Sequence, residues 1–205
     1  MQTVLLVDDN PELVSLYSRM LSLLGYEPII AHGGRECQER LNEKIPDAIL
    51  LDLMMEPIDG WETLRMIRNR VDCLLTPVIM LTARSPQPRE ILYCGDFLDG
   101  YIMKPITKTK LEHELQELWD RCSLLQSHLE KFRKMGASPE DTVDYMRSMR
   151  ACVSLTQVLK ELALPHFSGE DAEFMDNMVN EEIVRIKERL EEKKERIRMY
   201  QARLG

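Results

Sequence analysis

Residues 3–10 read Thr-Val-Leu-Leu-Val-Asp-Asp-Asn, a short apolar run that ends in two adjacent acids. A short apolar run of this kind predicts a strand. A helix-length segment follows directly, over about residues 11–24. A strand that leads straight into a helix is the repeating unit of a parallel α/β sheet.

The same alternation continues over the first 106 residues. Strands are predicted over residues 4–7, 27–31, 48–51, 78–81 and 101–103. Helices are predicted over about residues 11–24, 34–44, 60–70 and 88–95. The third and fourth strands are apolar at successive positions, as expected when helices cover both faces of a sheet. The pattern predicts a doubly wound α/β fold with a five-stranded parallel sheet, in which chemistry occurs at the carboxyl ends of the strands.

The strands stop after Pro105, and the rest of the chain is predicted to be helical. Three helices are expected, over about residues 107–134, 139–164 and 168–203. Ser138 and Pro139 are a typical cap and first residue of a helix. We therefore divide the chain into an α/β domain, residues 1–122, and an all-α region, residues 123–205, which continues the last helix of that domain.

Side chains that could carry chemistry fall at the ends of the predicted strands: Asp8, Asp9, Asp52, Thr82 and Lys104. Because parallel strands end at one edge of their sheet, we expect these side chains to lie together. Three carboxylates repel each other unless a cation binds, and oxygen ligands beside a phosphate favour Mg²⁺. Lys104 offers a positive charge and Thr82 a hydroxyl to phosphoryl oxygens. Each residue alone could be a cap, a turn residue or a surface charge, but the five together favour phosphoryl transfer.

These segments resemble the CheY-like receiver domain of two-component response regulators. The resemblance rests on five segments in the family's order, residues 4–10, 50–55, 59–62, 80–84 and 100–105. It implies that Asp52 accepts a phosphoryl group from a sensor histidine kinase. It also implies that the protein is no enzyme beyond its own phosphotransfer and dephosphorylation.

The resemblance also implies a metal site. By this resemblance, Asp8 or Asp9, together with Asp52 and the backbone carbonyl of Met54, would hold Mg²⁺. The loop after the acceptor departs from the family pattern, which usually has proline four residues beyond the acceptor. Here the chain has Glu56-Pro57 instead, which adds an acid near the site.

Three further features are implied by the same resemblance. Thr82 and Lys104 would contact the phosphoryl oxygens. Tyr101 would be an aromatic switch that moves inward with Thr82, although an aromatic side chain packed at the domain surface is the alternative. The Lys104–Pro105 bond matches one that is cis in the family.

The helix that follows the last strand carries an apolar seam with heptad spacing. Its members are Leu111, Leu115, Leu118, Cys122, Leu125, Leu129 and Phe132. The seam is longer than a receiver domain can cover. Pairing of two chains would cover it and predicts a homodimer, and burial against the later helices of the same chain is the alternative.

We expect the output to be a protein–protein interaction through this helical module, with an unidentified partner. The alternative is nucleic-acid binding, either as an RNA-binding antiterminator of the ANTAR type, which residues 136–147 faintly resemble, or as a DNA-binding transcription regulator. Residues 123–205 hold 14 Lys and Arg against 15 Asp and Glu. They therefore lack the positive excess that contact with a phosphate backbone usually needs.

The composition is that of an ordinary globular chain, with a net charge of −8. No apolar run is long enough to span a membrane, and no leader precedes the first strand, so a cytoplasmic protein is expected. The five cysteines form no Cys-x-x-Cys pair and the four histidines are scattered. Reduced thiols and no zinc site are therefore expected.

Overall fold

The computed structural model describes residues 1–83, 90, 97–162 and 172–203. The chain divides into two compact units, and each is considered by itself. Unit 1 contains residues 1–84 and 97–119, and unit 2 contains residues 85–96 and 120–205. The division falls inside the long helix α5 (Lys108–Lys134), near the boundary at residue 122 that the sequence predicts.

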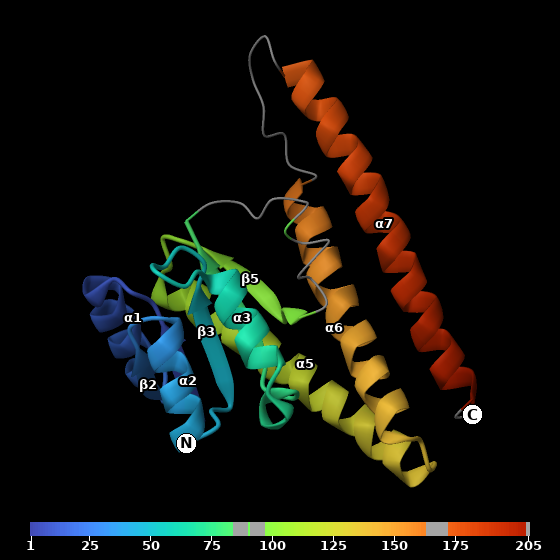
Figure 1. Cartoon of the computed structure of the whole chain (residues 1–205), viewed down its shortest axis with the longest axis horizontal. Coiled ribbons are helices and arrows are strands. Elements are labelled where there is room, and N and C mark those ends of the chain that lie inside the picture. Colours follow the sequence, from blue (N-terminus) through green and yellow to red (C-terminus); the bar gives the residue numbers. More distant parts are fainter. Residues whose placement is uncertain (84–89, 91–96, 163–171, 204–205) are drawn as a thin grey trace. The chain divides into compact units, whose positions relative to one another are not determined.

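Unit 1 contains a five-stranded parallel sheet with flanking helices, as the sequence predicts (Figure 1). Its strands are β1 (Thr3–Val7), β2 (Glu27–Ala31), β3 (Ala48–Asp52), β4 (Val78–Thr82) and β5 (Gly100–Met103). Their order across the sheet is β2-β1-β3-β4-β5. The chain therefore crosses over after β2, so that β1 and β3 lie side by side at the centre.

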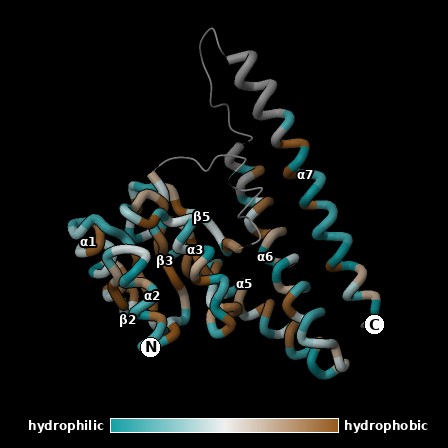
Figure 2. Tube along the Cα trace, viewed as in Figure 1, coloured by the Kyte–Doolittle hydropathy of each residue, from teal (hydrophilic) through white to brown (hydrophobic). Residues whose placement is uncertain are grey.

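The central strands form the core of unit 1. All five residues of β1, of β3 and of β4 are buried, and Figure 2 shows β3 as a hydrophobic strand. Helices on both sides of the sheet remove these strands from water, which explains why they are apolar at successive positions. Burying one such Leu or Val stabilises the fold by about 1.5–3 kcal/mol.

The helical elements of unit 1 are α1 (Pro11–Leu23), α2 (Gly34–Glu43), α3 (Gly60–Arg68), a short 3₁₀ turn η1 (Val71–Cys73) and the first part of α5. Side chains satisfy the first backbone N–H groups of α1 and α3, whereas no side chain caps α2. The Asn10 side chain accepts hydrogen bonds from the amides of Glu12 and Leu13, and Asp59 caps α3 in the same way. The predicted helix over residues 88–95 lies outside the described residues, apart from Glu90.

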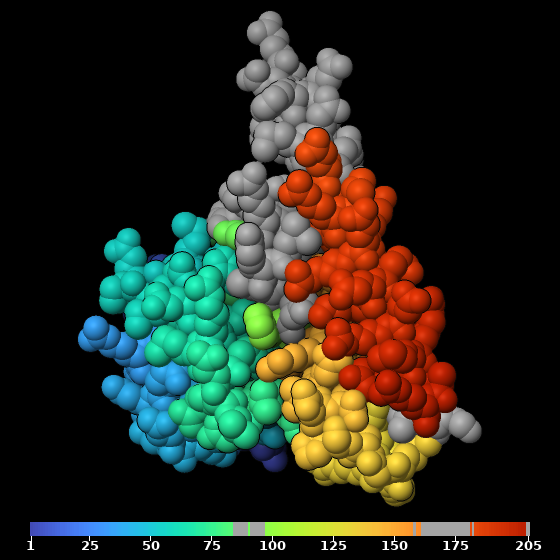
Figure 3. All heavy atoms as spheres, turned by 45° about the vertical axis from the view of Figure 1, so that its right-hand side comes forward, coloured from blue at the N-terminus to red at the C-terminus, as the bar shows by residue number. Residues whose placement is uncertain are grey.

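Unit 2 is all-α in its described part, as predicted. Beyond α5 it contains α6 (Pro139–Leu162) and α7 (Ala172–Arg203), and Ser138 caps α6 through a 3.0 Å hydrogen bond from the Asp141 amide. Helices α6 and α7 pack against each other, and the C-terminal part of α7 lies beside α6 in the space-filling view (Figure 3). The third helix is described from Ala172, so its predicted start near residue 168 lies outside the described residues.

An aromatic cluster joins the three helices of unit 2. Phe132 of α5, Tyr145 of α6 and Tyr200 of α7 are buried together. The rings of Phe132 and Tyr145 lie 4.3 Å apart between centroids. Around them, the Tyr145 hydroxyl is 3.0 Å from His128 Nδ1, and the Asp144 carboxylate accepts the Tyr200 hydroxyl at 2.7 Å.

Packing within one chain, including the aromatic cluster, covers the C-terminal part of the apolar seam. Leu129 and Phe132 are buried within a single chain, which is the alternative that the sequence left open for this stretch. Cys122 and Leu125 are half-buried, and Leu124 beside them is exposed. Pairing of two chains is not tested by this burial and stays a prediction.

Two smaller expectations concern the cysteines and the membrane. Cys37 and Cys73 are buried thiols, and Cys122 and Cys152 are half-buried thiols. Cys94 lies outside the described residues. Among the helices of the described ranges, none combines the length and the apolar character that crossing a bilayer requires.

Candidate functional site

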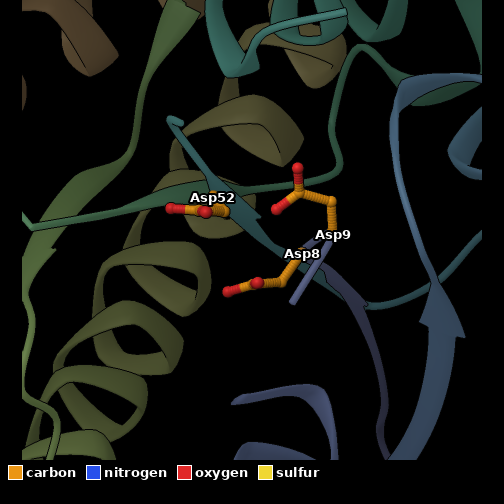
Figure 4. A group of neighbouring side chains, drawn as sticks. All are labelled: Asp8, Asp9 and Asp52. Carbon is orange, nitrogen blue, oxygen red and sulfur yellow. The ribbon is translucent and has the colours of Figure 1, made fainter. Parts of the chain in front are cut away.

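Three carboxylates meet at the carboxyl edge of the sheet. Asp8 and Asp9 directly follow β1, and Asp52 is the last residue of the neighbouring strand β3. Their ligand oxygens all lie within 4.8 Å of one another (Figure 4). Asp8 is completely buried and Asp52 is 5% exposed, whereas Asp9 is exposed. The sequence prediction that these acids come together is correct.

Lys104 bridges two of the acids. It directly follows β5, and its backbone amide donates to the carbonyl of Thr82 at the end of β4. Its Nζ lies 2.8 Å from Asp8 Oδ2 and 2.9 Å from Asp52 Oδ1. The ammonium therefore neutralises part of the negative charge of the cluster, from a side chain that is only 12% exposed.

Burial and the charge of Lys104 shift the pKa of Asp52 in opposite directions, and burial and hydrogen bonding do the same for the pKa of Lys104. Burial raises the pKa of Asp52, the hydrogen bond and charge of Lys104 lower it only in part, and the charge of Asp8 raises it further. Burial alone would lower the pKa of Lys104, but its hydrogen bonds to Asp8 and Asp52 outweigh this effect and raise it. The surroundings thus favour the charged form of Lys104 and disfavour the ionised form of Asp52.

The loop between β3 and α3 folds back onto the acids. The Glu56 amide donates to Asp9 Oδ2 at 3.1 Å. The Gly60 amide donates to the Leu53 carbonyl at 2.9 Å, and Gly60 lies so close to β3 that a Cβ there would overlap the Asp52 carbonyl oxygen. Only glycine allows this close approach, which explains the Asp59-Gly60 pair of the sequence. The peptide bonds before Pro57 and Pro105 are both cis, and the second matches the expectation.

The remaining predicted residues lie near the same edge. Thr82 is buried at the end of β4, one residue beyond the partner of Asp52 in the register of the two strands. Tyr101, on β5, is buried rather than packed at the surface. The Met54 side chain is exposed, and its backbone is hydrogen-bonded to the Asp52 carboxylate. The functional roles of Thr82, Tyr101 and Met54 are not tested by these positions and stay predictions.

Two contributors to the site were missed by the sequence reasoning. Tyr17 of α1 is buried; this burial raises its pKa, while the charge of nearby Lys104 lowers it. The helical spacing of Val14, Tyr17 and Leu21 indicates burial, but no sequence signal shows that the charge of Lys104 acts on Tyr17. The Glu56 amide was missed as well, because the identity of a residue says nothing of where its backbone N–H points.

The donor set fits a small divalent cation. Carboxylate oxygens are the ligands that Mg²⁺ prefers, and water completes its coordination where protein ligands are few. Exposed Asp9 leaves the cluster accessible from solvent, whereas buried Asp8 and Asp52 give it fixed positions. Among the described residues, Asp8, Asp9 and Asp52 form the group of at least three acids, histidines or cysteines whose ligand atoms are close enough to bind one metal ion.

Comparisons with known proteins agree with this geometry. The family described as "Response regulator receiver domain" matches residues 4–116. The transcriptional regulatory protein TrcR of Mycobacterium tuberculosis is 30% identical over 188 residues, which cover 81% of this chain and 72% of that protein. The transcriptional regulatory protein CpxR of Escherichia coli K12 is 36% identical over 121 residues, covering 59% of this chain and 50% of that protein. The chain thus spans about half the length of CpxR.

Solved structures show the same fold. The receiver domain of sensor histidine kinase PA1611 from Pseudomonas aeruginosa PAO1, with a magnesium ion in its active-site cleft, is 33% identical with a TM-score of 0.52; the match covers 57% of this chain and 96% of that one. The chemotaxis protein CheY4 of Vibrio cholerae is 29% identical with a TM-score of 0.54, covering 58% and 98%. The family match, the parallel sheet and the acidic cluster agree, and the chain belongs to the response regulator receiver domain family, with residues 4–116 as its receiver domain.

Proposed function

We propose that this protein is a response regulator that accepts a phosphoryl group on Asp52 from a sensor histidine kinase, in a reaction that requires Mg²⁺. One observation carries the proposal. Lys104 lies within 2.9 Å of both Asp8 and Asp52, in a cluster of three carboxylates whose oxygens are within 4.8 Å. A nucleophile, a fixed cation and a set of metal ligands are thus together at one edge of the sheet, and phosphoryl transfer needs little more than positioning and charge neutralisation.

Each residue has a part in the transfer. An oxygen of Asp52 forms the bond to phosphorus as the bond from phosphorus to the imidazole nitrogen of the kinase breaks, and the imidazole then takes up a proton. Asp8 or Asp9, together with Asp52 and the Met54 carbonyl, would hold Mg²⁺, which would supply positive charge to neutralise the phosphoryl oxygens. Lys104 exchanges its contact with Asp52 for a phosphoryl oxygen. The phosphoryl group then leaves Asp52 by hydrolysis, and we propose no enzymatic activity beyond this phosphotransfer and dephosphorylation.

The signal would leave the site through Thr82 and Tyr101. A phosphoryl group adds about −1.5 to −2 charges at neutral pH. Its oxygens would draw the Thr82 hydroxyl toward Asp52, and Tyr101 would take up the space that Thr82 leaves. Tyr101 is already buried in the present structure, so this step would require a change in how it packs rather than its entry from solvent.

The output would be a protein–protein interaction through the helical region, with homodimerisation through residues 107–205. Helix α5 begins three residues after Pro105 and continues into unit 2, so a displacement at the site could pass along a rigid element. Cys122 and Leu125 of the seam are half-buried and Leu124 beside them is exposed, so a second chain could cover this stretch. We expect light scattering to give a dimer for the full chain and a monomer for a truncation ending near Arg121. A monomeric full chain, both bare and phosphorylated, would refute this part.

Nucleic-acid binding is the second candidate. It is supported by the relatives TrcR and CpxR, which are transcriptional regulatory proteins, and by the match with TrcR, which covers more of the chain than the receiver family does. The near-balanced charge of residues 123–205 argues against it. Fluorescence anisotropy with labelled RNA and DNA, at two salt concentrations, separates the candidates: salt-dependent binding would favour this one.

The phosphorylation proposal is tested with acetyl phosphate as donor and intact-mass measurement as readout. We expect wild-type protein in the presence of Mg²⁺ to gain one phosphoryl group. The Asp52→Asn variant, which keeps the shape of the side chain but lacks the nucleophile, should gain none, and a chelator should prevent labelling of the wild type. Full labelling of Asp52→Asn would show that another residue is the acceptor.

A further inference from the structure

The loop between β3 and α3 contacts the acidic cluster through a backbone group. Glu56 lies four residues beyond Asp52, and its N–H donates to Asp9 Oδ2 at 3.1 Å. This hydrogen bond joins residues 47 positions apart in the sequence. It therefore ties the acceptor loop to the segment that follows β1, where the cation would bind.

The three acids of the cluster are held in different ways. Asp8 is completely buried and accepts hydrogen bonds from the Asn10 amide at 2.9 Å and from Lys104. Asp52 is also buried and is held by Lys104 and by the Met54 backbone. Asp9 is exposed, so packing does not fix its side chain. The amide of Glu56 thus acts on the ligand that most needs orientation.

Glu56 offers the site two groups with different effects. Its carboxylate is on an exposed side chain and is not among the acids that converge on the metal position. An exposed charge is screened by solvent and salt, so its effect on a nearby cation is small. Its amide, in contrast, makes a direct hydrogen bond to a ligand, and partners of this kind commonly control metal affinity.

We propose that the Glu56 amide is a positioning group for the metal site, holding the Asp9 carboxylate in the orientation that binds a divalent cation. The inference rests on the proposed Mg²⁺-dependent function and adds a determinant of its affinity. Proline, the usual residue at this position in receivers, has no N–H and could not make this hydrogen bond. The departure from the family pattern is therefore a gain of a hydrogen-bond donor rather than only the addition of an acid.

The test compares variants of the full chain that keep or remove the amide. Glu56→Gln and Glu56→Ala keep the N–H and remove the charge, whereas Glu56→Pro removes the N–H. Mg²⁺ affinity is measured from the fluorescence of Trp61, which follows Gly60 at the start of α3. We expect Glu56→Gln and Glu56→Ala to bind Mg²⁺ within about threefold of wild type, and Glu56→Pro to bind about tenfold more weakly.

A double-mutant cycle shows whether the effect passes through Asp9. In an Asp9→Ala background, Glu56→Pro should cause no further loss of affinity, because the acceptor of the hydrogen bond is absent. An equal loss in both backgrounds would overturn the inference. So would equal binding by Glu56→Pro and wild type, or a loss in Glu56→Gln as large as that in Glu56→Pro.

A second measurement does not depend on the folding of the proline variant. In the wild-type chain the Glu56 amide proton should resonate downfield, and Asp9→Ala should move it upfield. An amide resonance that ignores Asp9→Ala would overturn the inference. If wild-type protein fails to bind Mg²⁺, the proposed function fails together with the inference, whereas normal Mg²⁺ binding with no effect of Glu56→Pro overturns the inference alone.

Discussion

Replacing Lys104 by alanine tests the electrostatic arrangement of the site. The Lys104 ammonium is within hydrogen-bond distance of one oxygen of Asp8 and one oxygen of Asp52. Both carboxylates are almost inaccessible to water. Lys104→Ala therefore leaves two neighbouring negative charges in a buried position without their cation.

The expected loss of stability follows from this geometry. Removing one partner of a buried ion pair typically costs about 3–5 kcal/mol. The pKa of Asp52 is already raised, chiefly by burial. In the variant Asp52 can take up a proton and relieve part of the repulsion, so we expect the lower end, about 3 kcal/mol in the absence of metal. Mg²⁺ at a hundred times its dissociation constant stabilises the folded state by about 2.7 kcal/mol, so the metal-bound variant should be nearly as stable as the metal-free wild type.

Urea unfolding with a chelator and with excess Mg²⁺ measures both quantities. Lys108→Ala, which removes an exposed lysine at the start of α5, is the matched control and should change stability by less than about 0.5 kcal/mol. Phosphorylation of Lys104→Ala by acetyl phosphate should be slowed about a hundredfold, since a positioned cation is lost. A metal-free loss below about 1 kcal/mol, combined with unchanged labelling, would refute the role assigned to Lys104.

Other predictions address the nucleophile, the acceptor loop and unit 2. The pKa of Asp52 is raised above its ordinary value of 3.8, so between pH 3.8 and the raised pKa the metal-free folded chain binds more protons than the unfolded chain, and its free energy of unfolding falls as pH rises. Urea titrations across this pH range should show that Asp52→Asn becomes more stable relative to wild type as pH rises. Parallel pH profiles for the two proteins would contradict this. Gly60→Ala should lower the free energy of unfolding by about 1–3 kcal/mol and slow labelling, because the added methyl group overlaps the Asp52 backbone; normal labelling would show that the loop adapts. Phe132→Ala should destabilise the chain by about 3–5 kcal/mol, since its ring packs against Tyr145, whereas replacing the exposed neighbour Lys131 by alanine should have little effect. Circular dichroism during urea unfolding measures both variants. A loss below about 1 kcal/mol for Phe132→Ala would show that the aromatic cluster does not hold α5.

The sheet and the position of the site could be predicted because local signals and topology agree. An apolar run such as residues 48–51 has few interpretations other than a buried strand, and the observed β3 extends it by the single residue Asp52. Parallel strands bring their carboxyl ends to one edge of the sheet, so the sequence alone predicts that Asp8, Asp52 and Lys104 lie together.

The remaining features depend on three-dimensional contacts that have no local signal. The seam of α5 shows which side chains need cover, but heptad spacing is the same whether the cover is another chain or α6 and α7. The aromatic cluster of Phe132, Tyr145 and Tyr200 joins residues far apart in sequence, so the spacing of each helix could not reveal it. Similarly, the backbone hydrogen bond to Asp9 depends on the path of a loop.

Mapping the modified residue shows whether Asp52 accepts a phosphoryl group in a Mg²⁺-dependent reaction. Protein treated with acetyl phosphate and Mg²⁺ is reduced with borohydride, which converts a phosphorylated aspartate to homoserine, and the digested peptides are then sequenced by mass spectrometry. We expect homoserine at position 52, none at positions 8 and 9, and none anywhere when a chelator is present. Homoserine at another aspartate with residue 52 unchanged, or labelling that persists in the chelator, would contradict it.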